Sequence, residues 1–193
     1  MAAAQPAAAV RCAFWLAMVL LEVGEDAISS SWAARAEQLL AGIPGQVVEA
    51  GYLAFYRLYS ALVTGRYGDA PRLTAEVLDF GERFDAPDLV VLGLSAQSRI
   101  MIMNGQVAEG LARLDEGMAA LAAGRVDTIL AGEPYCMMIE TCQFILDFGR
   151  VVQWTRELGR WCADQPDLVM FTGQCAVHRR SCGWTAPSGP SLN

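Results

Sequence analysis

Four glycines recur at nearly even intervals along this chain: Gly24, Gly65, Gly105 and Gly149. The gaps between them are 41, 40 and 44 residues. Apolar stretches of helical length flank each of them, and glycine is the residue that most often ends a helix in a left-handed turn. A repeat of this length built from paired helices is typical of an α-solenoid. We therefore expect each glycine to end one helix and to precede the next.

The spacing of apolar residues predicts antiparallel helix pairs along most of the chain. The expected helices cover residues 10–23, 26–40, 47–64, 69–84, 88–104, 107–123, 135–148, 151–164 and 167–178. The predicted fold is an all-α, TPR-like α-solenoid over residues 10–179, preceded by a frayed N-terminus at residues 1–9. Trp15, Trp32, Trp154 and Trp161 are expected to pack between stacked helices.

The pattern ends at residues 180–193, which are rich in Gly, Pro and Ser and are expected to form an irregular tail. A second hypothesis is a slip of the reading frame. If GC-rich codons are assumed, one added guanine turns this segment into a helix–glycine–helix sequence in phase with the repeat. Sequencing the coding DNA would distinguish the two.

Composition limits the classes of function. Of 193 residues, 54% are hydrophobic and 18% charged, and the net charge is −7. A chain this acidic lacks the basic face that phosphate binding requires, so DNA binding would need a further domain. The apolar core of the segment 12–21 is about ten residues long, too short to span a bilayer. We expect a buried helix there, no membrane association and a cytoplasmic protein.

Catalytic and metal-binding motifs are not found. The sequence has no GxSxG, Walker A, GxGxxG or HExxH pattern. Its single histidine, His178, lies beside two arginines and is expected at a helix end. The six cysteines form no CxxC pair, which predicts no metal site and no cofactor, and reduced thiols that pack as small apolar groups. The protein is therefore not expected to be an enzyme.

Recognition of a protein or small effector is the favoured class. In TPR-like repeats the first helix of each pair lines the concave groove, and this phase brings aromatic and polar side chains to it. The groove candidates are Tyr52, Phe55, Tyr59, Ser95, Arg99 and Gln143. Arg99 is the single cation of the stretch 89–107. The alternative is that the aromatic stripe simply packs against a neighbouring helix.

Three segments resemble the helical-repeat region of actinobacterial LuxR-family transcriptional regulators. They are RCAFWLAMVLL at 11–21, NGQVAEGLARLDEGMAAL at 104–121 and YCMMIETCQFILDFGRVVQWTRELGRWCADQPDLVMFTGQCAVHR at 135–179. The resemblance implies an arm that senses an effector, binds a partner or self-associates, in a regulator whose DNA-binding helix-turn-helix is missing from this sequence. Two alternatives stay open: a free-standing TPR-like scaffold, and the helical arm of an ATPase or nucleotide cyclase regulator.

Overall fold

The computed structural model describes residues 4–124, 126–164 and 177. The described residues form eight α-helices and one short 3₁₀ helix, with no strand among them. The chain divides into two compact units, Met1–Arg125 and Val126–Asn193, each of which is described separately. The expected all-α class is confirmed.

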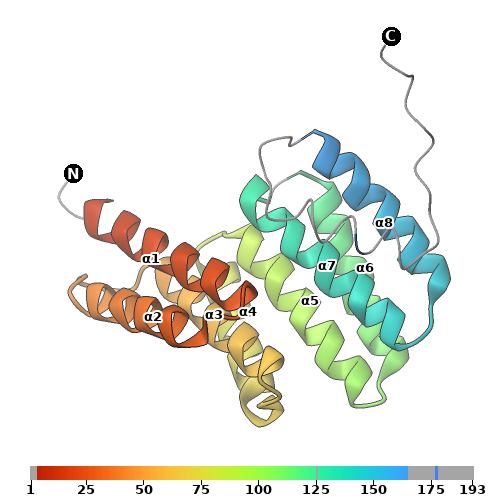
Figure 1. The fold of residues 1–193 in the computed structure, drawn as a ribbon, viewed down its shortest axis with the longest axis horizontal. Coiled ribbons are helices and arrows are strands. Elements are labelled where there is room, and N and C mark those ends of the chain that lie inside the picture. The colour runs from red at the N-terminus through yellow and green to blue at the C-terminus, as the bar shows by residue number, and fades with distance from the viewer. Residues whose placement is uncertain (1–3, 125, 165–176, 178–193) are drawn as a thin grey trace. The chain divides into compact units, whose positions relative to one another are not determined.

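Figure 1 shows the helices in chain order. The first unit contains α1 (Ala4–Glu22), α2 (Asp26–Ala41), α3 (Glu49–Val63), η1 (Tyr67–Asp69), α4 (Ala70–Arg83), α5 (Pro87–Met103) and α6 (Val107–Ala122). The second unit contains α7 (Thr128–Phe144) and α8 (Phe148–Ala163).

Two predicted boundaries at helix N-termini are wrong. Helix α1 begins at Ala4, so the described part of the segment expected to be frayed is helical, as its alanines favour. Helix α7 begins at Thr128 rather than at 135 and includes Pro134. Every residue from Ala131 to Ile139 is buried, and burial of this apolar segment outweighs the backbone hydrogen bond that proline removes. The helix expected at 167–178 falls on residues outside the described part, apart from Val177.

Three of the four repeat glycines do end helices in left-handed turns. The φ angles of Gly24, Gly65 and Gly105 are 79°, 73° and 84°. At Gly105 the backbone N–H bonds Ile102 O at 3.0 Å, and the next N–H, of Gln106, bonds Met101 O at 2.9 Å. This pair of bonds is the Schellman motif, which satisfies the last carbonyls of a helix.

Gly149 does not have the predicted role, because it lies in the first turn of α8. The left-handed residue before α8 is Leu146, with φ of 60°. Its N–H bonds Gln143 O and the following N–H, of Asp147, bonds Cys142 O at 2.9 Å, the same pattern as at Gly105. The left-handed turns 24, 65, 105 and 146 are thus spaced by 41, 40 and 41 residues, more evenly than the glycines.

Within the first unit each helix packs on its sequence neighbours, and α3 also contacts α1 and α5. Glycines permit the close approach of these helices. A Cβ added at Gly51 of α3 would lie 2.6 Å from Phe80 Cβ of α4 and 2.5 Å from Leu89 Cδ1 of α5. The core of this unit is built around fully buried side chains such as Phe14 and Phe55.

In the second unit α7 packs against α8. The Tyr135 ring of α7 lies 6.3 Å from the rings of both Trp154 and Trp161 on α8. These two tryptophans pack between helices as expected. Burial raises the pKa of Tyr135 above its ordinary value.

Candidate functional site

A polar cleft lies between α2, α3 and α4 of the first unit. Its volume is about 350 Å³. Small apolar side chains and Tyr56 mix in its lining with charged and hydroxyl groups. The lining residues are Ser30, Ala33, Ala34, Glu37, Tyr56, Arg57, Ser60, Ala61, Arg66, Asp69, Arg72 and Leu73. We call this the first cleft. A concave site with a few polar groups on an apolar lining suits recognition of a small ligand or a peptide side chain.

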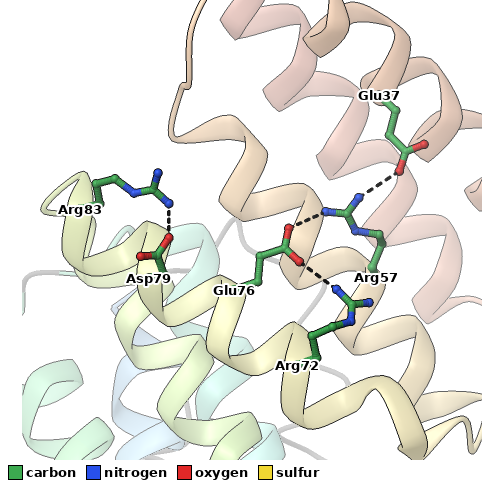
Figure 2. Close-up of polar contacts among 6 residues, drawn as sticks. All are labelled: Glu37, Arg57, Arg72, Glu76, Asp79 and Arg83. Atoms are coloured by element: carbon green, nitrogen blue, oxygen red, sulfur yellow. Dashed lines mark hydrogen bonds and ion pairs between the residues drawn. The ribbon is translucent and has the colours of Figure 1, made fainter.

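A chain of ion pairs crosses one wall of the first cleft (Figure 2). Arg57 of α3 lies 3.5 Å from Glu37 of α2 and 3.1 Å from Glu76 of α4, and Glu76 also lies 3.5 Å from Arg72. These side chains are partly exposed, so each pair contributes only about 0.2–1 kcal/mol. The chain links three helices and neutralises Arg57 and Arg72.

Arg66, in the turn after α3, is bonded differently from the other two arginines of the cleft. Its Nε donates to Thr64 Oγ1 at 3.0 Å and its Nη2 donates to Ser60 Oγ at 3.4 Å. Among the described residues, its hydrogen-bond partners are hydroxyl groups rather than carboxylates. A guanidinium in this state can still accept a carboxylate from a ligand in a strong, two-pronged contact.

Tyr56 at the cleft uses its hydroxyl within the protein. Ser29 Oγ donates to the Ala17 carbonyl at 2.7 Å, so the 2.8 Å contact between Ser29 Oγ and Tyr56 Oη has the tyrosine as donor. The three groups link α1, α2 and α3. The Tyr56 ring therefore gives the cleft a fixed wall.

A second, smaller cleft of about 220 Å³ lies between α4 and α5. Six lining positions repeat those of the first cleft after 40 or 41 residues: Pro71, Thr74, Gln97, Ile100, Met101 and Gln106 follow Ser30, Ala33, Arg57, Ser60, Ala61 and Arg66. Both arginines are replaced by glutamine, and the lining of the second cleft has no charged residue. The helix repeat therefore forms the same space twice and charges it once.

A separate polar cluster joins α1, α3 and α5 around the predicted groove residue Tyr52. Its hydroxyl donates to Asp88 Oδ2 at 2.9 Å, and the Arg11 guanidinium lies 3.6 Å from the ring centroid. Arg11 also pairs with Glu49 at 3.3 Å. Burial raises the pKa of Tyr52, Arg11 opposes that change and Asp88 adds to it. Tyr52 thus remains a protonated donor that ties three helices together.

The other groove candidates are not gathered in one site. Phe55 is fully buried beside Tyr59, with ring centroids 6.0 Å apart. Ser95 is buried and donates to the Val91 carbonyl of its own helix at 2.9 Å. Phe55 and Ser95 therefore present no surface to a ligand in this structure. Tyr59 and Arg99 are half-buried on α3 and α5, and half-buried Gln143 belongs to the second unit.

The sequence analysis missed the charged residues of the first cleft. Arg57 is the single charged residue between Ala50 and Val63, the same criterion that singled out Arg99. Arg72 and Glu76 have the i,i+4 spacing of a helical ion pair. Both signals were in the sequence, but helical periodicity alone does not show which charges from different helices meet.

Cysteines and acidic residues form no metal site in the part that the structure describes, where no group of three or more His, Cys, Asp or Glu could hold an ion. Cys136 and Cys142 are buried, as expected, whereas Cys12 is exposed. Cys12 lies on the outer side of α1, because only one face of that helix is covered by α2 and α3. None of the four described cysteines forms a disulfide.

Comparison with known proteins leaves the site without a precedent. No protein-family model matches this chain, and no curated protein or solved structure matches it. What the first cleft binds therefore has to be argued from its own residues.

Proposed function

We propose that this chain is a TPR-like helical-repeat module that binds a protein segment or a small effector, and that it is the arm of a LuxR-family transcriptional regulator. The observation that carries the binding proposal is the pair of clefts at equivalent repeat positions, of which only the first is charged. A repeat scaffold with one specialised position is the usual design of a recognition module. We further propose a cytoplasmic location.

The evenly spaced left-handed turns support the repeat assignment. They separate helix pairs by 40 or 41 residues, and the contacts of α3 with α1 and α5 suit stacked pairs in which the first helices line one side. We take this as support for an α-solenoid, in which an occupied cleft would alter the packing of neighbouring pairs and so bias an attached module.

The chemistry of the first cleft favours a ligand that carries a carboxylate. Arg66 has hydroxyl partners within the protein, while Arg57 and Arg72 are already paired with Glu76. An aspartate, a glutamate or a chain-terminal carboxylate of a bound segment would complete the coordination of Arg66. The role is recognition rather than catalysis.

Peptide selection tests the binding proposal. A random peptide display library is panned against the full chain, and the selected peptides are measured against the wild type, Arg66→Gln and Arg113→Gln. Arg66→Gln installs the residue of the second cleft, and Arg113 is an exposed arginine on α6 that pairs with Glu116 in its own helix. We expect carboxylate-bearing peptides whose affinity falls about tenfold in Arg66→Gln, a change of about 1.4 kcal/mol, and stays unchanged in Arg113→Gln. Equal affinities for all three proteins would contradict a role for the first cleft.

Genomic sequence tests the regulator assignment. The coding DNA would be read from the codon for Gln174 through the following kilobase. A frame that runs into a helix-turn-helix supports the regulator arm, and a nucleotide-binding or cyclase module supports the alternative arm. A confirmed stop codon after Asn193 would instead support a free-standing scaffold.

A further inference from the structure

The α1–α2 hairpin covers its inner face and leaves much of its outer face exposed. On α1, Val10, Phe14 and Ala17 are fully buried, whereas Leu16, Val19 and Val23 expose 41–68% of their surface. Together with Cys12 they form an uncharged stripe at helical spacing on the side opposite the core. Of the helices in the first unit, only α3 contacts the hairpin. Apolar surface of this kind is typical of an interaction site.

Helix α2 carries a second exposed stripe, and this one has charges at its two ends. Glu25, Ile28, Trp32 and Arg35 follow one another at i, i+3, i+7 and i+10, which places them along one side of the helix. Ile28 is 50% and Trp32 38% exposed, so the expectation that Trp32 packs between stacked helices is wrong. We call these four residues the α2 stripe.

The charges of the α2 stripe are available to a partner. Among the described residues the Glu25 side chain makes no hydrogen bond or ion pair, and Arg35 makes one long contact of 3.5 Å to the amide oxygen of Gln38. An exposed acid, two large apolar groups and an exposed base thus stand in sequence along about 15 Å of helix.

We propose that the α2 stripe is a homodimer interface, in which two copies pack α2 against α2 in antiparallel orientation about a two-fold axis near residue 30. In that arrangement, positions whose numbers sum to 60 face each other. Glu25 of each copy faces Arg35 of the other, and Ile28 of each faces Trp32 of the other. The stripe is therefore complementary to itself, as a two-fold interface requires. The proposal does not depend on what the first cleft binds.

A second copy explains this face better than a lipid surface. Helix α1 contains one window, Gln5–Glu22, that is long and apolar enough to cross a bilayer, which corrects the expectation that this segment is too short. However, the turn beside the stripes carries Glu22, Glu25 and Asp26, and the chain has a net charge of −7. Helices that bind membrane surfaces are instead bordered by Lys and Arg.

Charge reversal and charge exchange test the pairing. The full chain is examined by analytical ultracentrifugation over a range of concentrations, as wild type, Glu25→Arg, Arg35→Glu and an equimolar mixture of the two variants. We expect the wild type to dimerise weakly, because the stripe is short. Each single variant sets like charges against each other twice and should raise the dissociation constant at least tenfold. The mixture restores both opposite-charge contacts and should recover the dimer.

Asp26→Arg is the matched control, since it makes the same change of charge one residue away, on a different side of α2. It should dimerise like the wild type, and circular dichroism should show the same helicity for all variants. The proposal is overturned if the wild type stays monomeric, if the single variants dimerise normally, or if their mixture stays monomeric. It is also overturned if the wild type is monomeric in solution and binds phosphatidylcholine vesicles through this face.

Discussion

The two clefts of the first unit occupy the same place in consecutive helix pairs and differ in charge. Arg57 and Arg66 in the first become Gln97 and Gln106 in the second, and Ser60 becomes Ile100. Both clefts share helix α4, and both have a residue that follows a left-handed glycine, Gly65 or Gly105. The comparison shows that backbone geometry produces the cavity, whereas a few side chains decide what it can hold.

The largest expected effect comes from α4, which contributes to both clefts. Gly51→Val should lower the free energy of unfolding by about 2–3 kcal/mol, because its side chain would overlap Phe80 and Leu89. Urea denaturation followed by circular dichroism measures this. Gly68→Ala is the control, since a Cβ there has no neighbour within 4 Å and should change stability by less than about 0.5 kcal/mol. If both variants had equal stability, the close packing of α3 on α4 and α5 would be wrong.

The two turns provide a stricter comparison. Gly65→Ala and Gly105→Ala should each cost about 1 kcal/mol, because both glycines have positive φ and neither has a close neighbour that a Cβ would overlap. Thermal and urea unfolding of the two variants should agree within about 0.5 kcal/mol. A clear difference between them would show that the turns are not equivalent.

The third substitution extends the comparison to the second unit. Leu146→Gly should stabilise the protein by about 0.5–1 kcal/mol, because a leucine holds the left-handed position that glycine occupies at 65 and 105. Leu146 is largely exposed, so little burial is lost. Leu146→Ala keeps the Cβ and should show no such gain, and a gain in both variants would point to a cause other than backbone conformation.

The ion pairs of the first cleft should have a smaller effect on stability. Arg57→Gln reproduces the second cleft and should cost about 0.5 kcal/mol at low salt, since Arg57 is partly exposed and bridges Glu37 and Glu76. The loss should shrink in high salt, because ions screen exposed charges. Unfolding in low and high salt measures both values, and a loss that is independent of salt would argue for packing instead.

The smallest effect concerns pH at the turn before α8. The Asp147 carboxylate accepts from the Arg150 side chain at 2.7 Å and from its backbone N–H at 3.1 Å, and these bonds lower the Asp147 pKa. A lowered folded-state pKa contributes stability above the unfolded value, which is lost as pH falls through the folded value. Asp147→Asn should therefore lose less stability than the wild type on acidification. Equal losses would show that Arg150 does not act on this group.

Sequence patterns predicted the helices and three turns well, because local bonding decides both. A Schellman turn favours glycine, so Gly24, Gly65 and Gly105 were visible in the sequence. The fourth turn was misplaced because Leu146 occupies the left-handed position, while Asp147 caps α8 and leaves Gly149 inside the helix. A residue that tolerates strain in the folded chain leaves no local sign.

The candidate site was harder to predict, because it depends on which helix covers each face. The stripe of Tyr52, Phe55 and Tyr59 was assigned to α3 correctly, but periodicity could not show that Phe55 is covered completely. Arg57 meets Glu37 and Glu76 only because α2 and α4 both pass beside α3. Such meetings are set by crossing geometry, which a one-dimensional pattern does not contain.

The short range of the helix contacts has a consequence for the folding rate. In the described part of the first unit, no helix contacts another more than two helices away along the chain. Contacts between residues that are close in sequence need little loop closure, so we expect rapid folding that can start in any hairpin. Amide hydrogen exchange should then show hairpins that open separately, each at its own free energy.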